Sequence, residues 1–175
     1  MNRKNLLMYV IVIAMVTVVA FPWTTTAQDV AETNSMTGIS LWVDDFGYNA
    51  AAGGWRVNQH PRIMADVNGD GKDDVVGFGG AGVYVALSSG SGFNSPQLWI
   101  NDFGYEAGEW RMDQHPRMMA DVNGDGKDDV VGFGGAGVIV SLSTGSDFSA
   151  SQTWVNDFGY NDNGGGWRVD QHPRM

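Results

Sequence analysis

The chain has 175 residues, no cysteine and a formal charge of −10, from 20 acidic and 10 basic side chains. The absence of cysteine excludes disulfides, and the negative charge makes nucleic acid a poor partner, because it repels phosphate backbones. The 25 glycines and seven tryptophans indicate short strands joined by tight turns rather than helices.

The first 27 residues have the order of a secretory signal peptide. A basic start at Arg3 and Lys4 precedes 16 uncharged residues, 6–21, and the small residues 25–27 offer a cleavage site. We therefore expect a secreted, extracellular protein with no membrane attachment after cleavage. An uncleaved membrane anchor is the alternative, because the apolar run is slightly long for the core of a signal peptide, although it is slightly short for a membrane span.

Residues 28–40 form a polar leader without a pattern, and four short strands are expected from residue 62 onward. Apolar residues alternate with others over 63–67, and further apolar segments follow at 74–78, 83–87 and 98–100, separated by turns rich in glycine and asparagine. Four short antiparallel strands in about 55 residues predict one blade of a β-propeller, an all-β fold.

A duplication defines the domain organisation. Residues 65–83 are repeated without change at 120–138, which predicts one blade repeat over 62–116 and a second over 117–175, the latter ending in a truncated connector. Residues 41–61 are interpreted as the last strand of a preceding blade, 41–43, followed by a connector. Because propellers close with about 4–8 blades, two blades are expected to belong to a larger propeller; several copies of this chain closing one ring are the alternative.

An acidic loop occurs once in each repeat, with the sequence DVNGDGKDD. Side-chain oxygens at its first, third, fifth and ninth places, with the carbonyl of the seventh, form the oxygen-only set that calcium prefers. An EF-hand is excluded, because Gly77 and Gly132 stand at the twelfth place, where that motif needs an acid. A solvated acidic turn without metal is the alternative. The expected calcium ligands are Asp66, Asn68, Asp70, Lys72 and Asp74 in the first repeat, and Asp121, Asn123, Asp125, Lys127 and Asp129 in the second.

A second motif occurs three times and links each blade to the next. All three copies share Asp-Phe-Gly-Tyr, then Trp-Arg, then Gln-His-Pro-Arg. Aromatic rings offer flat faces to a pyranose, and arginine, histidine and aspartate offer directional hydrogen bonds. Alternatively, Phe46 and Trp55 fill the space between blades, Arg56 pairs with Asp45, and His60 is a turn residue. The candidate sugar-binding residues are Asp102, Tyr105, Trp110, Arg111, His115 and Arg117, with Tyr48, Trp55, Arg56 and His60 before them and Tyr160, Trp167, Arg168 and His172 after them.

These motifs carry a resemblance to a known family. The acidic loop followed by VVGFGGAGV resembles the FG-GAP (VCBS) repeat of integrin α-type propellers, and with WRV(N/D)QHPR it is similar to the repeats of the Psathyrella velutina lectin type. That resemblance implies a structural calcium in each blade, about seven blades in the whole propeller, and sites for N-acetylglucosamine-type sugars between neighbouring blades. Here the middle connector, 102–117, is flanked by two complete blades.

The function expected is therefore that of a secreted lectin that binds glycans. An enzyme is not expected, because catalysis needs one unique constellation whereas this motif recurs three times, and Glu106 and Glu109 have no counterparts in the other connectors. Two alternatives stay open: an integrin-like scaffold or adhesion module, and an accessory propeller of a larger secreted enzyme.

Overall fold

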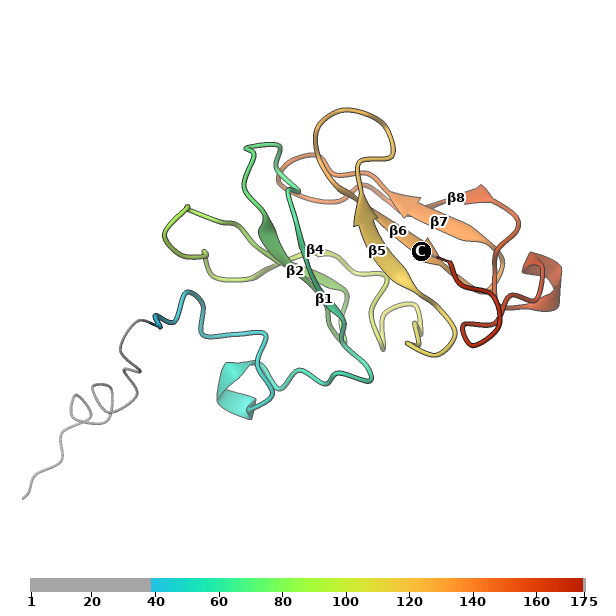
Figure 1. Cartoon of the computed structure of the whole chain (residues 1–175), viewed down its shortest axis with the longest axis horizontal. Helices are drawn as coiled ribbons and strands as arrows, with labels where there is room; N and C mark the ends of the chain where they lie inside the picture. Colours follow the sequence, from blue (N-terminus) through green and yellow to red (C-terminus); the bar gives the residue numbers. More distant parts are fainter. Residues whose placement is uncertain (1–38, 175) are drawn as a thin grey trace, which may run out of the picture. The chain divides into compact units, whose positions relative to one another are not determined.

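The computed structural model describes residues 39–174, so the predicted signal peptide and nearly all of the leader lie outside the described residues (Figure 1). The chain divides into a unit of residues 1–40 and a unit of residues 41–175, and the second unit contains both repeats. No helix within residues 39–174 is long and apolar enough to cross a membrane.

The unit of residues 41–175 contains two four-stranded antiparallel sheets, one for each repeat, as the sequence predicts (Figure 1). Strands that follow one another in the chain are neighbours in each sheet, which is the order expected of propeller blades. The first sheet consists of β1 (Arg62–Ala65), β2 (Asp74–Phe78), β3 (Val83–Ala86) and β4 (Gln97–Ile100), and the second of β5 (Arg117–Ala120), β6 (Asp129–Phe133), β7 (Val138–Ser141) and β8 (Gln152–Val155). The first and third strands end slightly earlier than expected.

The two sheets also share their register and their irregularities. In both, the pairing of the third strand with the fourth shifts at its first residue, at Val83 and at Val138. Gly82 precedes this shift with a φ of 141°, and a Cβ there would collide with the carbonyl oxygen of Ile100. Glycine is therefore required at the end of the GGAG turn, because only glycine allows the backbones to approach so closely.

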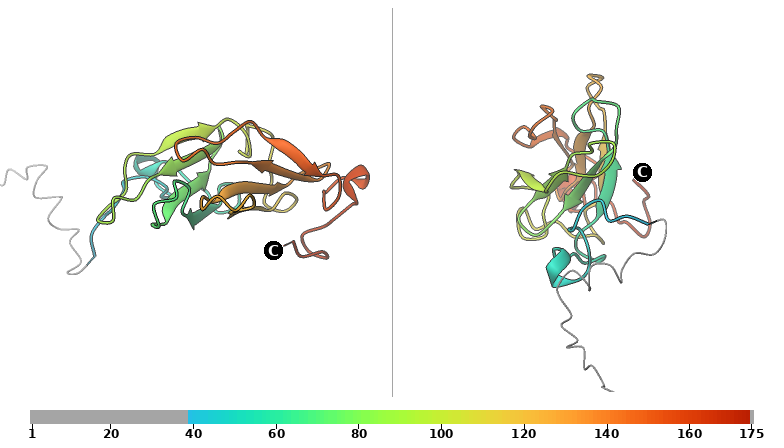
Figure 2. Two further views of the ribbon diagram at one scale, coloured as in Figure 1. Left: turned by 90° about the horizontal axis from the view of Figure 1, so that it is seen from above. Right: turned by 90° about the vertical axis from the view of Figure 1, so that its left-hand side faces the viewer.

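The apolar core lies at the seam, the contact zone between the two sheets, where β1 and β5 approach each other (Figures 1 and 2). Val76 and Phe78 of the first sheet belong to the same buried cluster as Val130 of the second. Trp99 on β4 contacts Phe148, which follows β7, with ring centroids 5.2 Å apart. Each sheet therefore buries one face against its neighbour, as expected of a stacked repeat.

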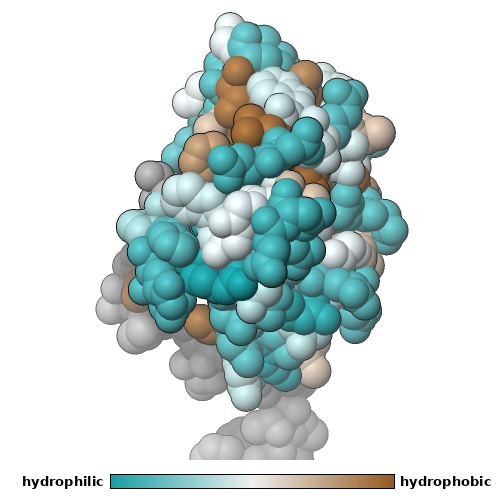
Figure 3. Space-filling view, turned by 90° about the vertical axis from the view of Figure 1, so that its right-hand side faces the viewer, coloured by the Kyte–Doolittle hydropathy of each residue, from teal (hydrophilic) through white to brown (hydrophobic). Residues whose placement is uncertain are grey.

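The face of the second sheet that points away from the seam is less covered. Trp154, the counterpart of Trp99, is 48% exposed, whereas Trp99 is 7% exposed. Figure 3 views this side of the molecule and shows a mainly hydrophilic surface on which the hydrophobic residues gather in one part.

The expected strand over residues 41–43 is wrong, because this segment has no strand structure. A strand here would need the third strand of a preceding blade as its antiparallel partner, and residues 39–174 contain only the two sheets described above. The carbonyl of Trp42 instead accepts the Phe93 N–H at 3.1 Å, and their rings lie 5.6 Å apart. Trp42 thus contacts Phe93 in the same way that Trp99 contacts Phe148.

Candidate functional site

The Trp-Arg…His part of each connector folds into one tight turn. In the middle connector, the His115 N–H donates to the Arg111 carbonyl at 2.7 Å, and the Arg111 N–H donates to His115 Nδ1 at 3.3 Å. The same two bonds join Arg56 with His60 and Arg168 with His172. Because Nδ1 accepts, the neutral ring carries its proton on Nε2, which is left as the donor available to a ligand.

The aspartate of Asp-Phe-Gly-Tyr organises the other half of the connector. Asp102 Oδ1 accepts the Phe103 N–H at 2.6 Å and the Trp110 indole N–H at 3.1 Å. Phe103 has a φ of 58°, a conformation that this hydrogen bond helps to hold. Asp45 and Asp157 make the same pair of bonds in the other two connectors. Asp45 makes these contacts instead of the pair with Arg56 that the structural alternative to sugar binding proposed, and Arg56 donates to backbone carbonyls.

The connector tryptophans pack into the protein rather than facing solvent. Trp110 is 3% exposed, lies 4.9 Å from the Phe103 ring, and occupies the space that a Cβ on Gly132 would need. Trp55 is 6% exposed and lies against Gly77 in the same way. Trp110 therefore has no open ring face for a sugar, and the structure matches the alternative in which these rings fill the space beside the blade. Trp167 is half-buried.

The arginine that ends each connector clamps one repeat to the next. Arg117 is 7% exposed, donates to the Phe103 carbonyl at 2.8 Å and lies 5.4 Å from the Phe78 ring of the preceding sheet. Burial, followed by the charge of Arg111, lowers the pKa of Arg117 to about 10, so it remains charged at neutral pH.

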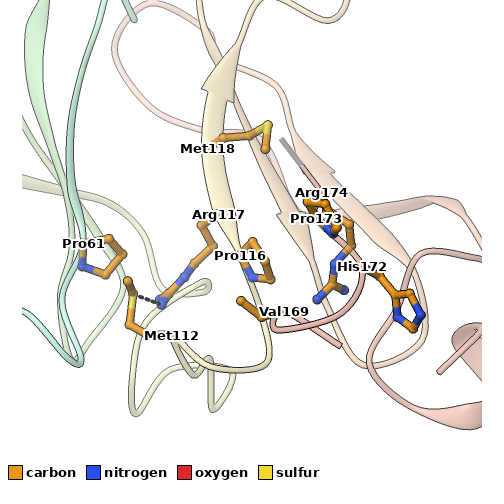
Figure 4. A pocket seen from close by; sticks show the side chains of 9 residues that line it. All are labelled: Pro61, Met112, Pro116, Arg117, Met118, Val169, His172, Pro173 and Arg174. Atoms are coloured by element: carbon orange, nitrogen blue, oxygen red, sulfur yellow. Dashed lines mark hydrogen bonds between the residues drawn. The ribbon is translucent and has the colours of Figure 1, made fainter. Parts of the chain in front are cut away.

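Arg174 makes the corresponding contacts with the Phe158 carbonyl and the Phe133 ring. Both clamp arginines line an apolar pocket of about 480 Å³, shown in Figure 4, where Arg117 also reaches Met112. Both arginines therefore have a structural role at the end of their connectors.

Tyrosine, arginine and histidine side chains remain accessible above this packed layer. The Arg111 guanidinium lies 3.9 Å from the centre of the Tyr105 ring, and Arg56 and Arg168 stack on Tyr48 and Tyr160 in the same way. His60 meets Tyr105 of the next connector edge-on, at 6.3 Å between centroids. The structure thus brings together residues from two successive connectors.

Two grooves flank this contact. The connector groove, of about 470 Å³, is lined by Asn58, Gln59, Tyr105, Arg111, Met112, Asp113 and Gln114. The hairpin groove, of about 240 Å³, lies between the first connector and the β2–β3 turn and is lined by Asp45, Gly53, Trp55, His60, Gly79, Gly80 and Tyr84. Sequence analysis missed Asn58, Gln59, Asp113 and Gln114, although the recurring Asn/Asp-Gln before His-Pro could have indicated them. Tyr84 was also missed, because Ile139 replaces it in the second repeat.

The acidic loops are held by their own backbone. Asp66 accepts the Gly69 and Asp70 N–H groups on Oδ1 and the Gly71 N–H on Oδ2, at 2.7–3.2 Å. Asp74 is fully buried and accepts the N–H groups of Val67 and Ser88, and burial raises its pKa.

Asp70 pairs with Lys72 at 2.6 Å, and this hydrogen bond lowers the pKa of Asp70. Asp121, Asp125 and Asp129 repeat the pattern of the first loop.

In this conformation the loops do not form a ready calcium cage. Within residues 39–174, no group of three or more acidic or histidine side chains is arranged to hold a metal ion. The oxygens of Asp66 and Asp74 point toward amides, and Asp70 is turned toward an ammonium group. The carboxylate, amide and carbonyl oxygens of the loops are of the kind that calcium prefers, but in this conformation they do not converge on one point.

The similarity of this chain to known proteins is found among solved structures. No protein-family model matches this chain, and no curated protein matches it. Among solved structures, the chain is similar to an Agrocybe aegerita lectin, with 44% sequence identity and a TM-score of 0.66, and the match covers 70% of this chain. The chain spans 31% of the length of that lectin, whose structure is described as showing specific recognition of non-reducing terminal N-acetylglucosamine.

Proposed function

We propose that this protein is a carbohydrate-binding protein, a lectin for glycans that end in N-acetylglucosamine-type sugars. The observation that carries the proposal is the 44% identity, over 70% of this chain, to a lectin described as recognising terminal N-acetylglucosamine. Because the chain spans 31% of that lectin, the likeness concerns the repeats present here. That relative is a lectin, which agrees with the expectation that this protein is not an enzyme.

The two grooves support this proposal by their size and chemistry. Their volumes of about 240 and 470 Å³ suit one or two sugar rings. Tyr105 offers an aromatic ring, Arg111 and the Nε2–H of His60 offer donors, and Gln59 and Asp113 offer acceptors. We infer that sugar binds beside the His60–Tyr105 contact, where two connectors contribute to one site.

A titration of the purified chain tests this function. We expect N-acetylglucosamine and its β1,4-linked oligomers to give binding heat, with galactose as the negative control. Tyr105→Ala should weaken binding, because it removes a ring that borders the connector groove. Tyr48→Ala is the matched control: Tyr48 makes the same stack with its own arginine but is 70% exposed and lines neither groove. Absence of binding to every N-acetylated sugar would overturn the proposal.

Calcium in the acidic loops is a further proposal, supported by the oxygen donors of the two identical loops. Binding would require Asp70 to leave Lys72 and the oxygens of Asp66, Asn68 and Asp70 to turn toward one ion, so weak affinity is expected, about 10⁻⁴–10⁻³ M. Millimolar calcium should therefore raise the melting temperature of the chain. The double variant Asp70→Asn/Asp125→Asn should lose that rise; an equal rise in both proteins would contradict calcium binding at these loops.

Secretion to the extracellular space is likewise proposed, from the basic, apolar and small-residue order of residues 1–27. Expression with its own leader, followed by N-terminal sequencing of the protein recovered from the medium, tests it. A mature chain that begins near Gln28 is the expected result, and an intact Met1 in the cell fraction would contradict it.

A further inference from the structure

We propose that the apolar pocket beside Arg117 and Arg174 binds a small organic carboxylate, whose apolar part lies against the proline, methionine and valine side chains of the pocket. This site is separate from the two grooves proposed for sugar, and the inference does not depend on the lectin function. It rests on two buried arginines that line one pocket without an acidic partner.

The pocket lies where the ends of the three connectors meet at the start of β5 (Figure 4). Its volume of about 480 Å³ is sufficient for a ligand of one or two rings. The equivalent prolines of the three connectors line it together with three other apolar residues: Pro61, Pro116, Pro173, Met112, Met118 and Val169. The polar atoms of its lining side chains belong to Arg117, His172 and Arg174. The pocket therefore suits a ligand that has an apolar body and an anionic group.

Neither Arg117 nor Arg174 is paired with a carboxylate. The three ion pairs within residues 39–174 involve other residues, and no residue that lines this pocket is acidic. Arg117 is 7% exposed and Arg174 is 6% exposed. Burial, followed by the charge of a second arginine, Arg111 or Arg168, lowers the pKa of Arg117 and of Arg174. Because buried charges are normally paired, a bound anion would compensate the positive charge of this pocket.

The hydrogen-bonding capacity of the two guanidinium groups is also incompletely used. Across the described part of the chain, Nε of Arg117 and Nε of Arg174 are the buried side-chain nitrogens or oxygens without a hydrogen-bond partner. Nη1 of each donates to a backbone carbonyl, and Nη2 of Arg174 donates to the Gln114 carbonyl.

Arg117 has the weaker set of partners. Its Nη2 contacts the Met112 sulfur at 3.4 Å, and both residues line the pocket (Figure 4). A thioether is a weak acceptor, whereas hydrogen bonds to an ionised acceptor are strong. We therefore expect a carboxylate oxygen in the pocket to replace the sulfur as the acceptor of Nη2.

The first connector supplies an internal comparison. Arg62 is the counterpart of Arg117 and donates to the equivalent carbonyl, that of Phe46. Arg62 is exposed and is not among the residues that line the pocket. Val57, the counterpart of Met112, is 77% exposed. The bond to the phenylalanine carbonyl therefore forms without burial, so this bond alone does not explain the enclosed guanidinium groups of the pocket.

Benzoate is a suitable probe, because it joins one carboxylate to one apolar ring. For a ligand of this size we expect a dissociation constant of about 1 mM. A hydrogen bond from a charged group should give about a tenfold preference over a neutral ligand of the same shape. The formal charge of the whole chain is −10, so its overall charge repels benzoate and cannot be the cause of such a preference.

Calorimetry with benzoate, benzamide and acetate tests the site. Benzamide lacks the charge and acetate lacks the ring, so benzoate should bind about tenfold more tightly than either. Val169→Glu should weaken benzoate binding by about tenfold, because it adds a carboxylate to the wall of the pocket at a residue that is 40% exposed. Val57→Glu is the matched control, since it adds the same charge at the equivalent position of the first connector, outside the pocket.

The guanidinium group is tested directly by Arg117→Gln, which should remove the preference for benzoate over benzamide. Circular dichroism checks the fold of each variant; if Arg117→Gln is unfolded, the comparison of Val169→Glu with Val57→Glu decides. The proposal is overturned by equal affinities for benzoate and benzamide, by equal effects of the two valine variants, or by the absence of benzoate binding.

A competition experiment separates this site from the sugar site. N-acetylglucosamine should leave the benzoate affinity unchanged, because the two ligands occupy different places. Displacement of benzoate by the sugar would make the pocket part of the sugar site and would overturn a separate carboxylate site. If benzoate binds as expected but no N-acetylated sugar binds, the lectin function is overturned and this proposal is supported.

Discussion

The imidazole of His60 lies edge-on against the ring of Tyr105, 6.3 Å away, although the two residues belong to successive connectors. His115 and Tyr160 repeat this contact at 5.8 Å. In each case the histidine is fixed from behind by the N–H of its own arginine, so the contact has a defined orientation. Neighbouring repeats thus meet through rings whose positions the connector turns determine.

Replacing Trp110 with alanine is expected to cost about 3–5 kcal/mol of unfolding free energy, because it empties a buried site between Phe103 and Gly132. The matched change Trp167→Ala should cost less, since Trp167 is half-buried. Urea unfolding of the two variants measures the difference. Equal losses, or a loss of sugar binding by Trp110→Ala at unchanged stability, would show that burial does not govern the role of Trp110.

His115 is expected to titrate below the ordinary value of 6.5. Burial, with the charges of Arg117, Arg111 and Arg174, lowers the pKa of His115, and protonation of Nδ1 would break its bond from the Arg111 N–H. The unfolded chain therefore binds the proton more readily than the folded one. The stability that neutral His115 contributes is complete above pH 6.5 and is lost as the pH falls through the lowered pKa.

Proton NMR of the His115 ring across acidic pH measures this pKa directly, and the melting temperature should fall over the same range. His115→Ala separates this contribution from that of the carboxylates. A ring that titrates above 6.5 would contradict the contacts described for it.

Arg117→Ala should destabilise the fold by about 1.5–3 kcal/mol from the lost hydrogen bond to Phe103, with a further loss from the uncovered Phe78 ring. Arg62→Ala provides the comparison within the same protein. Arg62 makes the equivalent bond to the Phe46 carbonyl but is exposed, so its loss should cost less than about 1 kcal/mol. Chemical denaturation distinguishes them; similar costs would mean that the clamp does not depend on burial.

Gly82→Ala should prevent correct pairing of β3 with β4, because the added Cβ would collide with the Ile100 carbonyl oxygen. Gly71→Ala serves as the control: it also has a positive φ, of 80°, but a Cβ there meets nothing within 4 Å. Its cost should stay near 1 kcal/mol, from backbone strain alone. Thermal melts of both variants, with expression yield as a second readout, test the difference.

The sequence predicted the sheets well because their signals are local. Alternating residues before Val67, the DVVGF segments and the glycine turns fixed each strand to within two residues at either end. The strand predicted over residues 41–43 was wrong for the opposite reason. A strand needs a hydrogen-bonded partner, and the sequence pattern cannot reveal whether one is present. The two short 3-10 helices, η1 (Ala50–Ala52) and η2 (Asp162–Gly164), were also missed, since three residues carry no helical period.

The candidate sugar-binding residues stay a prediction, although the structure shows what several of their side chains contact. Composition identified the connectors as chemically rich, and the grooves lie there. It could not separate Trp110, buried against Gly132, from Tyr105 beside a groove, because aromatic residues serve packing and binding equally well. Nor could it show that Asp102 holds the Trp110 indole, a bond created by the connector turn.

The two acidic loops also touch each other. The Asp66 N–H donates to the Asp128 carboxylate at 3.1 Å, and the Asp128 N–H donates to the Asp66 carbonyl at 2.8 Å. Unfolding of one loop therefore removes hydrogen bonds from the other. This interface energy between neighbouring repeats couples the unfolding of the two sheets. Melting of this pair should consequently proceed as a single cooperative transition rather than one sheet at a time.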